Sequence, residues 1–305
     1  MNQFSEWSRC AIIALAIIAG VVSTSSRSAD ATPGDFVAAT QAAYVDARPQ
    51  LENSPFHRPL SIDSEQSGAR LTGSIEARLD APFADVAKSL SDADGWCRIM
   101  LLMPNIADCH GTADRYAHAL SVGLVRKFDD APRAATPVRF SFDVDAQPDG
   151  LQVSLEAPNG PLGTRNYRIR LQAVPVADGQ TFITLRYSDE YGWAARMAAR
   201  VYMATSGADK IGFSSSGTSA DGKPQYVGGL RGAIERNAMR CYLAIETYLS
   251  TAKLDDDARF GAALQRWTQA IAEYPAQLAE EDIDAYRRAK LRDAAAAASD
   301  AGASS

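Results

Sequence analysis

The sequence is poor in the residues that usually carry metal-dependent or nucleophilic chemistry. Its 305 residues include only three histidines, and none of them stands at metal-ligand spacing from another histidine or a cysteine. Cys109 and His110 are neighbours, so their side chains diverge and do not form a thiol–imidazole pair. The run Ser214–Gly217 lacks the flanking glycine of a nucleophile elbow. We therefore assign no catalytic residue, no metal and no cofactor from the sequence.

The chain also lacks a cluster of basic residues. Its formal net charge is −6, which disfavours binding to nucleic acid and to anionic lipid headgroups. The adjacent acidic residues Asp189-Glu190 and Asp255–Asp257 fall in predicted connectors, where solvated caps are the usual role of carboxylates.

No hydrophobic run is long enough to be an obvious membrane span. The apolar stretch Cys10–Val22 has thirteen residues, whereas a spanning helix needs about 20. It is preceded by Arg9 and followed by small residues, among which Ala29-Asp30-Ala31 fits the A-x-A pattern of signal-peptide cleavage. We predict a signal peptide over residues 1–31, cleavage after Ala31 and a periplasmic location; an uncleaved anchor is the alternative.

Cysteine is scarce, and three residues would remain after cleavage: Cys97, Cys109 and Cys241. Export to an oxidising compartment favours a disulfide between Cys97 and Cys109, which would contribute about 3 kcal/mol in the chain-entropy model. Two buried free thiols are the alternative. Cys241 falls on the apolar stripe of a long helix and is expected to be a core residue.

What the sequence has in abundance is alternation of apolar and polar residues. Such alternation indicates strands with one buried and one solvated face, and it is clearest in four stretches: Val138–Val144, Leu151–Leu155, Tyr167–Leu171 and Thr181–Tyr187. A further strand is predicted over Ala69–Leu79, followed by short helices over Phe83–Leu90 and Trp96–Met103. Residues 32–65 contain a short helical candidate and scattered prolines, and we expect a surface arm there.

A long amphipathic helix over Leu230–Leu249 follows the strands. Between the last strand and this helix, residues 188–229 form an insertion, with a helix predicted over Gly192–Ser206 and a hairpin over Ile211–Val227. Residues 251–305 are predicted to form a C-terminal helical extension.

The order of these elements resembles the helix-grip fold of START-like lipid-transfer and polyketide-cyclase-like domains. The residues that carry this resemblance are Leu71–Leu79, Pro82–Met103, the strands up to Tyr187, and Leu230–Leu249. It implies an α+β fold in which an antiparallel sheet wraps around a long C-terminal helix, here over residues 66–250. The stretches Trp96-Cys97, Gly160–Ile169 and Tyr226–Gly232 also look like those of uncharacterised exported proteobacterial proteins, a resemblance that implies no activity.

The helix-grip resemblance implies a cavity between the sheet and the long helix, and no shared catalytic residues. Candidate ligand-binding residues on the helix are Arg231, Asn237, Tyr242, Ile234, Ala238 and Ile245. Candidates on the sheet are Tyr167, Tyr187, Phe140 and Phe142. The alternatives are that Arg231 pairs with Glu235 and that the apolar side chains form a solid core.

We therefore expect a periplasmic protein that binds or transports a lipid or another apolar small molecule. Transient membrane contact through Gly192–Ser206 would fit this function, and no nucleic-acid partner is expected. One alternative is a cyclase- or hydrolase-type enzyme that uses the same cavity. Another is a non-catalytic scaffold that binds a partner through an apolar stripe of its C-terminal helices: Phe260, Leu264, Trp267 and Ile271.

Overall fold

The computed structural model describes residues 35–113, 118–160, 163–192, 197, 210–219, 221–279 and 282–303. The expected signal peptide and nearly all of the helix expected over Gly192–Ser206 lie outside these residues, and the two expectations stay predictions. None of the described helices has a stretch long and apolar enough to cross a membrane.

An eight-stranded antiparallel sheet forms the centre of the molecule. The strands follow one another in space in the order β1-β2-β8-β7-β6-β5-β4-β3. Their bounds are β1 Leu60–Ser67, β2 Arg70–Leu79, β3 Ile106–Ala113, β4 His118–Leu124, β5 Thr136–Gln147, β6 Gly150–Asn159, β7 Thr164–Val176 and β8 Gln180–Tyr191. Short 3-10 turns at Pro132–Ala134 and Ala177–Gly179 lie between strands. The four stretches of alternating residues are confirmed as β5, β6, β7 and β8.

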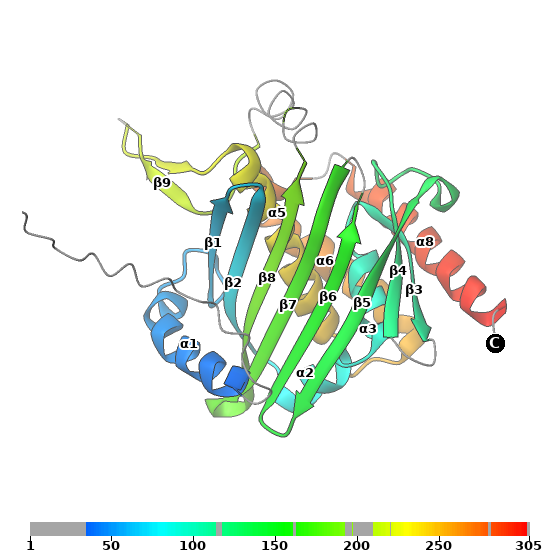
Figure 1. Cartoon of the computed structure of the whole chain (residues 1–305), viewed down its shortest axis with the longest axis horizontal. Helices are drawn as coiled ribbons and strands as arrows, with labels where there is room; N and C mark the ends of the chain where they lie inside the picture. Colours follow the sequence, from blue (N-terminus) through cyan, green and yellow to red (C-terminus); the bar gives the residue numbers. More distant parts are fainter. Residues whose placement is uncertain are drawn as a thin grey trace, which may run out of the picture.

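Helices cover the concave apolar side of this sheet, behind the strands as drawn in Figure 1. The helices that contact the strands are α2 Phe83–Leu90, α3 Ala93–Leu101, α5 Gly229–Leu249 and α8 Ile283–Ala303, while α6 Asp256–Ala272 and α7 Pro275–Leu278 pack on α5. The long helix α5 packs closely on β2, because Gly73 has no side chain. A Cβ atom at this position would lie 3.0 Å from the Ile234 carbonyl oxygen and 3.1 Å from the Ala238 Cβ. The α+β helix-grip arrangement is thus confirmed.

The face of α5 that points away from the sheet is buried as well. On a helical wheel Leu243 and Thr247 lie opposite the apolar stripe, and both are buried beneath α6 and its neighbours. Arg236 is also buried, and its Nη1 donates to the carbonyl of Ile211 at 3.0 Å. This face is buried because α6 returns along the same side of α5.

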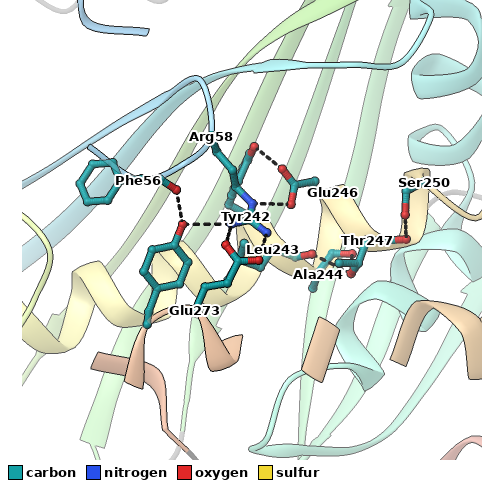
Figure 2. A network of polar contacts seen from close by, with 10 residues as sticks. Phe56, Arg58, Tyr242, Leu243, Ala244, Glu246, Thr247, Ser250 and Glu273 are labelled. Carbon is teal, nitrogen blue, oxygen red and sulfur yellow. Dashed lines mark hydrogen bonds and ion pairs between the residues drawn. The ribbon is translucent and has the colours of Figure 1, made fainter. Parts of the chain in front are cut away.

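A polar network links the end of α6 and the N-terminal region to α5, as Figure 2 shows. Arg58, in the loop before β1, donates from Nε to Glu246 at 2.8 Å and from both Nη atoms to Glu273 at 2.5 and 3.0 Å. Its Nη1 also donates to the Tyr274 hydroxyl at 3.1 Å, and Tyr242 donates to Glu246 at 2.9 Å. One guanidinium therefore joins the N-terminal region, α5 and the end of α6.

The N-terminal region is part of the sheet, which corrects the expectation of a surface arm. Strand β1 pairs with β2 along its whole length and forms one edge of the sheet. Helix α1 (Asp35–Glu52) packs on the outer face, where Phe36 and Leu51 contact a small apolar cluster around Val174 and Phe182. At this end of β7 and β8 both faces are buried, with Val174 and Phe182 on the face that α1 covers.

The insertion contains the predicted hairpin, which is formed by β9 (Ser215–Thr218) and β10 (Pro224–Tyr226). The apolar stripe of the C-terminal helices is packed inside the molecule, with Trp267 fully buried and stacked on Tyr286 at 5.2 Å between ring centroids. Phe260, Leu264 and Ile271 are buried with it. The stripe is therefore not a free partner surface, and the scaffold hypothesis loses its basis.

Cys97 of α3 and Cys109 of β3 form a disulfide, as predicted. The bridge ties a helix that packs against the sheet to the edge strand at the opposite end from β1. Cys241 is a buried free thiol.

Replacing both Cys97 and Cys109 by alanine is expected to lower the free energy of unfolding by about 3 kcal/mol, because the unfolded chain regains its loop entropy. Equilibrium urea denaturation of the oxidised protein and the double variant measures this difference. As a control, Cys241→Ala should keep the sensitivity of the wild type to a reducing agent. An unchanged unfolding midpoint in the double variant would contradict a stabilising bridge.

Candidate functional site

A cavity of about 180 Å³ lies between the sheet and helices α3 and α5. Its apolar wall comes from α3, β3, β4, β5 and β7, and its polar groups come mainly from β7, β8 and α5. The lining residues are Ile99, Met100, Met103, Asn105, Ile106, Val122, Leu124, Val125, Phe140, Tyr167, Ile169, Tyr187, Asp189, Tyr191, Asn237 and Cys241. The cavity is thus largely apolar, with a cluster of polar groups where β8 ends.

The alternation of β8 continues beyond the stretch that the sequence pattern emphasised. Ile183 and Leu185 are buried in the core, and Tyr187, Asp189 and Tyr191 follow at a spacing of two residues and line the cavity. Successive side chains of a strand point to opposite faces, so these three share the inner face. Because Asp189 is in phase with Ile183 and Leu185, its carboxyl group points to the inner face of the sheet.

A bulge in β7 shapes the sheet beside this carboxyl. The pairing of β7 with β8 is irregular between Arg165 and Arg168, where Asn166 and Tyr167 together lie opposite Asp189. Asn166 adopts a left-handed backbone conformation with φ of 53°, which asparagine tolerates better than most residues. Tyr167 is in phase with Ile169 and Leu171 on the inner face, whereas beyond the bulge the phase changes, so that Thr164 is buried and Arg165 is exposed.

Asp189 is the most unusual group in the cavity. Its side chain is almost completely buried, with 3% of the residue exposed, and among the described residues its Oδ1 atom has no hydrogen-bond partner. Burial raises the pKa of this carboxyl to about 7, because a carboxylate loses its hydration in an apolar environment. Around neutral pH the group therefore exchanges between a neutral and an ionised form.

Three tyrosines surround this carboxyl and remain protonated. Burial is the main cause that raises the pKa of each phenol, and the nearby Asp189 charge adds to it; the pKa of Tyr167 reaches about 12. The Tyr167 hydroxyl donates to the Thr164 hydroxyl at 2.6 Å. Tyr187 and Tyr191 contribute the other two rings and hydroxyls near Asp189.

Helix α5 adds only neutral groups. It contributes the Asn237 amide and the Cys241 thiol, and burial raises the pKa of that thiol to about 12. The described lining residues include no lysine, arginine or histidine. The described part of the cavity can therefore accommodate an apolar body and a hydrogen-bond donor, and it offers no cation to an anionic group.

Four of the ten predicted ligand-binding residues lie on this cavity wall: Phe140, Tyr167, Tyr187 and Asn237. Their contact with a ligand stays a prediction. Phe142, Ile234, Ala238 and Ile245 are buried in the core and are not among the lining residues. For these four the solid-core alternative describes their positions, and Ile234 and Ala238 lie where α5 packs directly on β2.

Two predicted polar contacts must be corrected. Arg231 donates from Nε to the Ser64 hydroxyl at 3.1 Å and lies 3.9 Å from the Asp63 carboxylate, so it faces β1. Tyr242 is fully buried, and its hydroxyl donates to Glu246 in the network of Figure 2. Both side chains have partners outside the cavity, and Arg231 does not form the alternative pair with Glu235.

Asp189 was predicted to be a solvated cap in a connector and was not among the predicted ligand-binding residues. The period-two pattern from Ile183 onward contained the necessary signal, but the pair Asp189-Glu190 looked like a connector after the last apolar residue. Only Glu190 has the expected solvated role, with Arg70 and Asn166 donating to its carboxylate at 2.9 Å each. The two neighbouring carboxylates therefore lie on opposite faces of β8.

No known family model matches this chain, and no curated protein matches it. Among solved structures, it is similar to a STAR-related lipid transfer protein fragment from Xanthomonas axonopodis, with 14% identity over 63% of this chain and 98% of that one, and a TM-score of 0.35. Human StAR-related lipid transfer protein 5 is 8% identical over 71% and 97% of the two chains, with a TM-score of 0.35. Norcoclaurine synthase from Thalictrum flavum is 15% identical over 45% and 82%, with a TM-score of 0.31. These values are low, and the fold follows from the strand order and helix packing of this chain itself.

Proposed function

We propose that this protein binds a small, mostly apolar molecule in the cavity between the sheet and α5. The observation that carries this proposal is the cavity itself, which has an apolar wall on one side and the Asp189 carboxyl on the other. Pockets of this composition, apolar with a few oriented polar groups, are typical of small-molecule sites. The resemblance to lipid-transfer domains agrees with an apolar ligand.

The size of the cavity favours a ligand much smaller than a lipid. Its volume of about 180 Å³ is below the roughly 300–1,000 Å³ of ordinary ligand pockets. It is close to the roughly 150 Å³ of an engineered cavity that accepts benzene. A molecule about as large as one ring fits without rearrangement, whereas a long acyl chain would require the sheet and α3 to separate.

We also propose that the protein is exported and acts in the periplasm. The N-terminal pattern and the Cys97–Cys109 disulfide support this location. Fractionation of the native host with a C-terminally tagged full chain, followed by mass determination, tests it. Recovery of the uncleaved chain in the cytosol would contradict the proposal.

The binding function is tested by native mass spectrometry of protein purified from its native host, with extraction and identification of any molecule that copurifies. Calorimetric titration with toluene provides a defined probe. We expect saturable binding of one toluene molecule, because a ring of this size matches the cavity. Absence of binding by both toluene and any copurified molecule would contradict the proposed function.

Filling the cavity is expected to abolish this binding. Val122 lies on the cavity wall and is buried, so Val122→Phe places a ring in the space of the ligand. We expect at least a tenfold loss of toluene affinity with a change in stability of about 1–3 kcal/mol. The control is Val144→Phe, at an exposed position of the same sheet, which should bind toluene like the wild type.

A second candidate function is acid–base catalysis by Asp189. The observation that favours it is the pKa of about 7, since an acid–base group works best when its pKa is near the operating pH. The test compares host metabolite extracts incubated with the wild type and with Asp189→Asn by mass spectrometry. A product formed by the wild type alone would support catalysis, and identical extracts would argue for binding without chemistry.

A further inference from the structure

The described polar groups of the cavity are either neutral or negatively charged. The described lining residues contribute one carboxyl, three phenols, two amides and one thiol, and they hold no cation. A buried polar group without a partner costs free energy, and a buried carboxylate costs more than a neutral group. Among the described residues no side chain pairs with the Asp189 Oδ1 atom, and a bound molecule can supply this partner.

The charge of the site decides which molecules can supply that partner. A ligand with a carboxylate or a phosphate would bring a second negative charge next to Asp189, in a space where the described residues cannot neutralise it. A ligand with a protonated amine would satisfy the carboxylate and cancel its charge. Charge-assisted hydrogen bonds of this kind are about twice as strong as neutral ones.

The aromatic side chains agree with a positively charged ligand. Tyr167, Tyr187, Tyr191 and Phe140 contribute rings to the same cavity, and the faces of such rings attract cations. The rest of the wall is aliphatic or thioether, which suits the carbon skeleton of a small amine.

We propose that the cavity is a binding site for a small apolar amine, whose ammonium group pairs with the buried Asp189 carboxylate beside the tyrosine hydroxyls. This inference rests on the proposed binding function and names the chemical class of the ligand. The amine's carbon skeleton occupies the space between Ile99, Val122 and Ile169, and its nitrogen faces β8.

Four probes of one size test the inference: toluene, benzyl alcohol, benzylamine and benzoate, titrated calorimetrically into the full chain at pH 8. We expect benzylamine to bind at least tenfold more tightly than toluene, and benzoate to bind more weakly than toluene. If toluene binds and benzylamine binds no better, the amine proposal is overturned while the cavity function stands. If no probe binds, the cavity function itself fails.

The pH dependence provides an independent readout. The amine needs the ionised carboxylate, so benzylamine affinity should rise about tenfold from pH 6 to pH 8, as expected for a group with a pKa of about 7. The other titratable groups that line the cavity are Tyr167, Tyr187, Tyr191 and Cys241, which all keep their protons in this range. Benzylamine affinity independent of pH would contradict a contact with Asp189.

Two variants separate recognition from folding. Asp189→Asn should bring benzylamine affinity down to that of toluene and leave toluene binding within about twofold of the wild type, which shows that the cavity persists. Asp189→Glu keeps the charge and should retain part of the preference for the amine. If Asp189→Asn still prefers benzylamine by tenfold or more, the pairing is refuted.

Discussion

Asp189→Asn is expected to make the protein more stable than the wild type at pH 8, by about 4 kcal/mol, and to change its stability little at pH 4. The buried carboxyl has a pKa of about 7 instead of its ordinary value of 3.8, and each unit of difference corresponds to about 1.4 kcal/mol. Asparagine has the same size and carries no charge that must be desolvated.

The direction of this pH dependence follows from the difference in proton binding between the folded and the unfolded chain. The folded protein holds a proton on Asp189 more tightly than the unfolded chain does, so the wild type loses stability as the pH rises from about 4 to about 7. Above the folded-state pKa the wild type has the full free-energy cost of burying an ionised carboxylate, and the asparagine variant does not have this cost. Urea denaturation of both proteins at pH 4, 6 and 8 measures the difference.

The neighbouring residue supplies a matched control. Glu190 is solvated, and the hydrogen bonds from Asn166 and Arg70 lower the pKa of its carboxyl. Glu190→Gln should therefore not stabilise the protein at pH 8. A stability difference between Asp189→Asn and the wild type that stays the same from pH 4 to pH 8 would contradict a carboxyl that titrates near neutrality. A gain in stability on removing a residue would indicate that Asp189 is kept for function.

Glu235→Ala is expected to destabilise the protein by about 3–5 kcal/mol, through the loss of a buried acceptor. Glu235 lies in α5 with no exposed surface and accepts hydrogen bonds from the backbone N–H groups of Phe213 and Ser214, at 2.6 and 2.9 Å. The hydroxyls of Ser214 and Ser64 also donate to it. One side chain thus joins the segment before β9, the edge strand β1 and α5.

The alanine variant leaves these four donors without an acceptor, so the hairpin should also be released from α5. Thermal unfolding measures the loss of stability, and limited proteolysis detects cleavage near residues 211–219. Glu65→Ala, an exposed carboxylate on the same edge strand, is the control and should change the stability by less than about 0.5 kcal/mol. A Glu235→Ala protein as stable and protease-resistant as the wild type would contradict an anchoring role.

Much of the architecture could be predicted from the spacing of apolar residues in the sequence, because a strand or helix with one buried face has apolar residues at a regular spacing. The period of two in β5 to β8 and the apolar stripe of α5 predicted the sheet, the long helix and the side of each that meets the other. The two cysteines were paired on the expectation of export. Of the ligand-binding candidates, Phe140, Tyr167, Tyr187 and Asn237 reached the cavity wall because they lie on those faces.

Other features depend on segments that are distant in sequence. The second face of α5 is buried because α6 returns along it, and the partner of Glu246 in α5 is Arg58 from the N-terminal region. The outer face of β7 and β8 is covered by α1, whose own sequence has only a weak amphipathic pattern.

The alternating strands by themselves determined that this chain encloses an apolar interior between a sheet and a helix, because side-chain direction in a strand is a local property. Only the tertiary structure decided that the interior keeps a cavity and that Asp189 lies in it. Burial of that carboxyl requires β2 and the β7 bulge on either side of β8, with α5 above, and its pKa follows from the water that this combined packing removes.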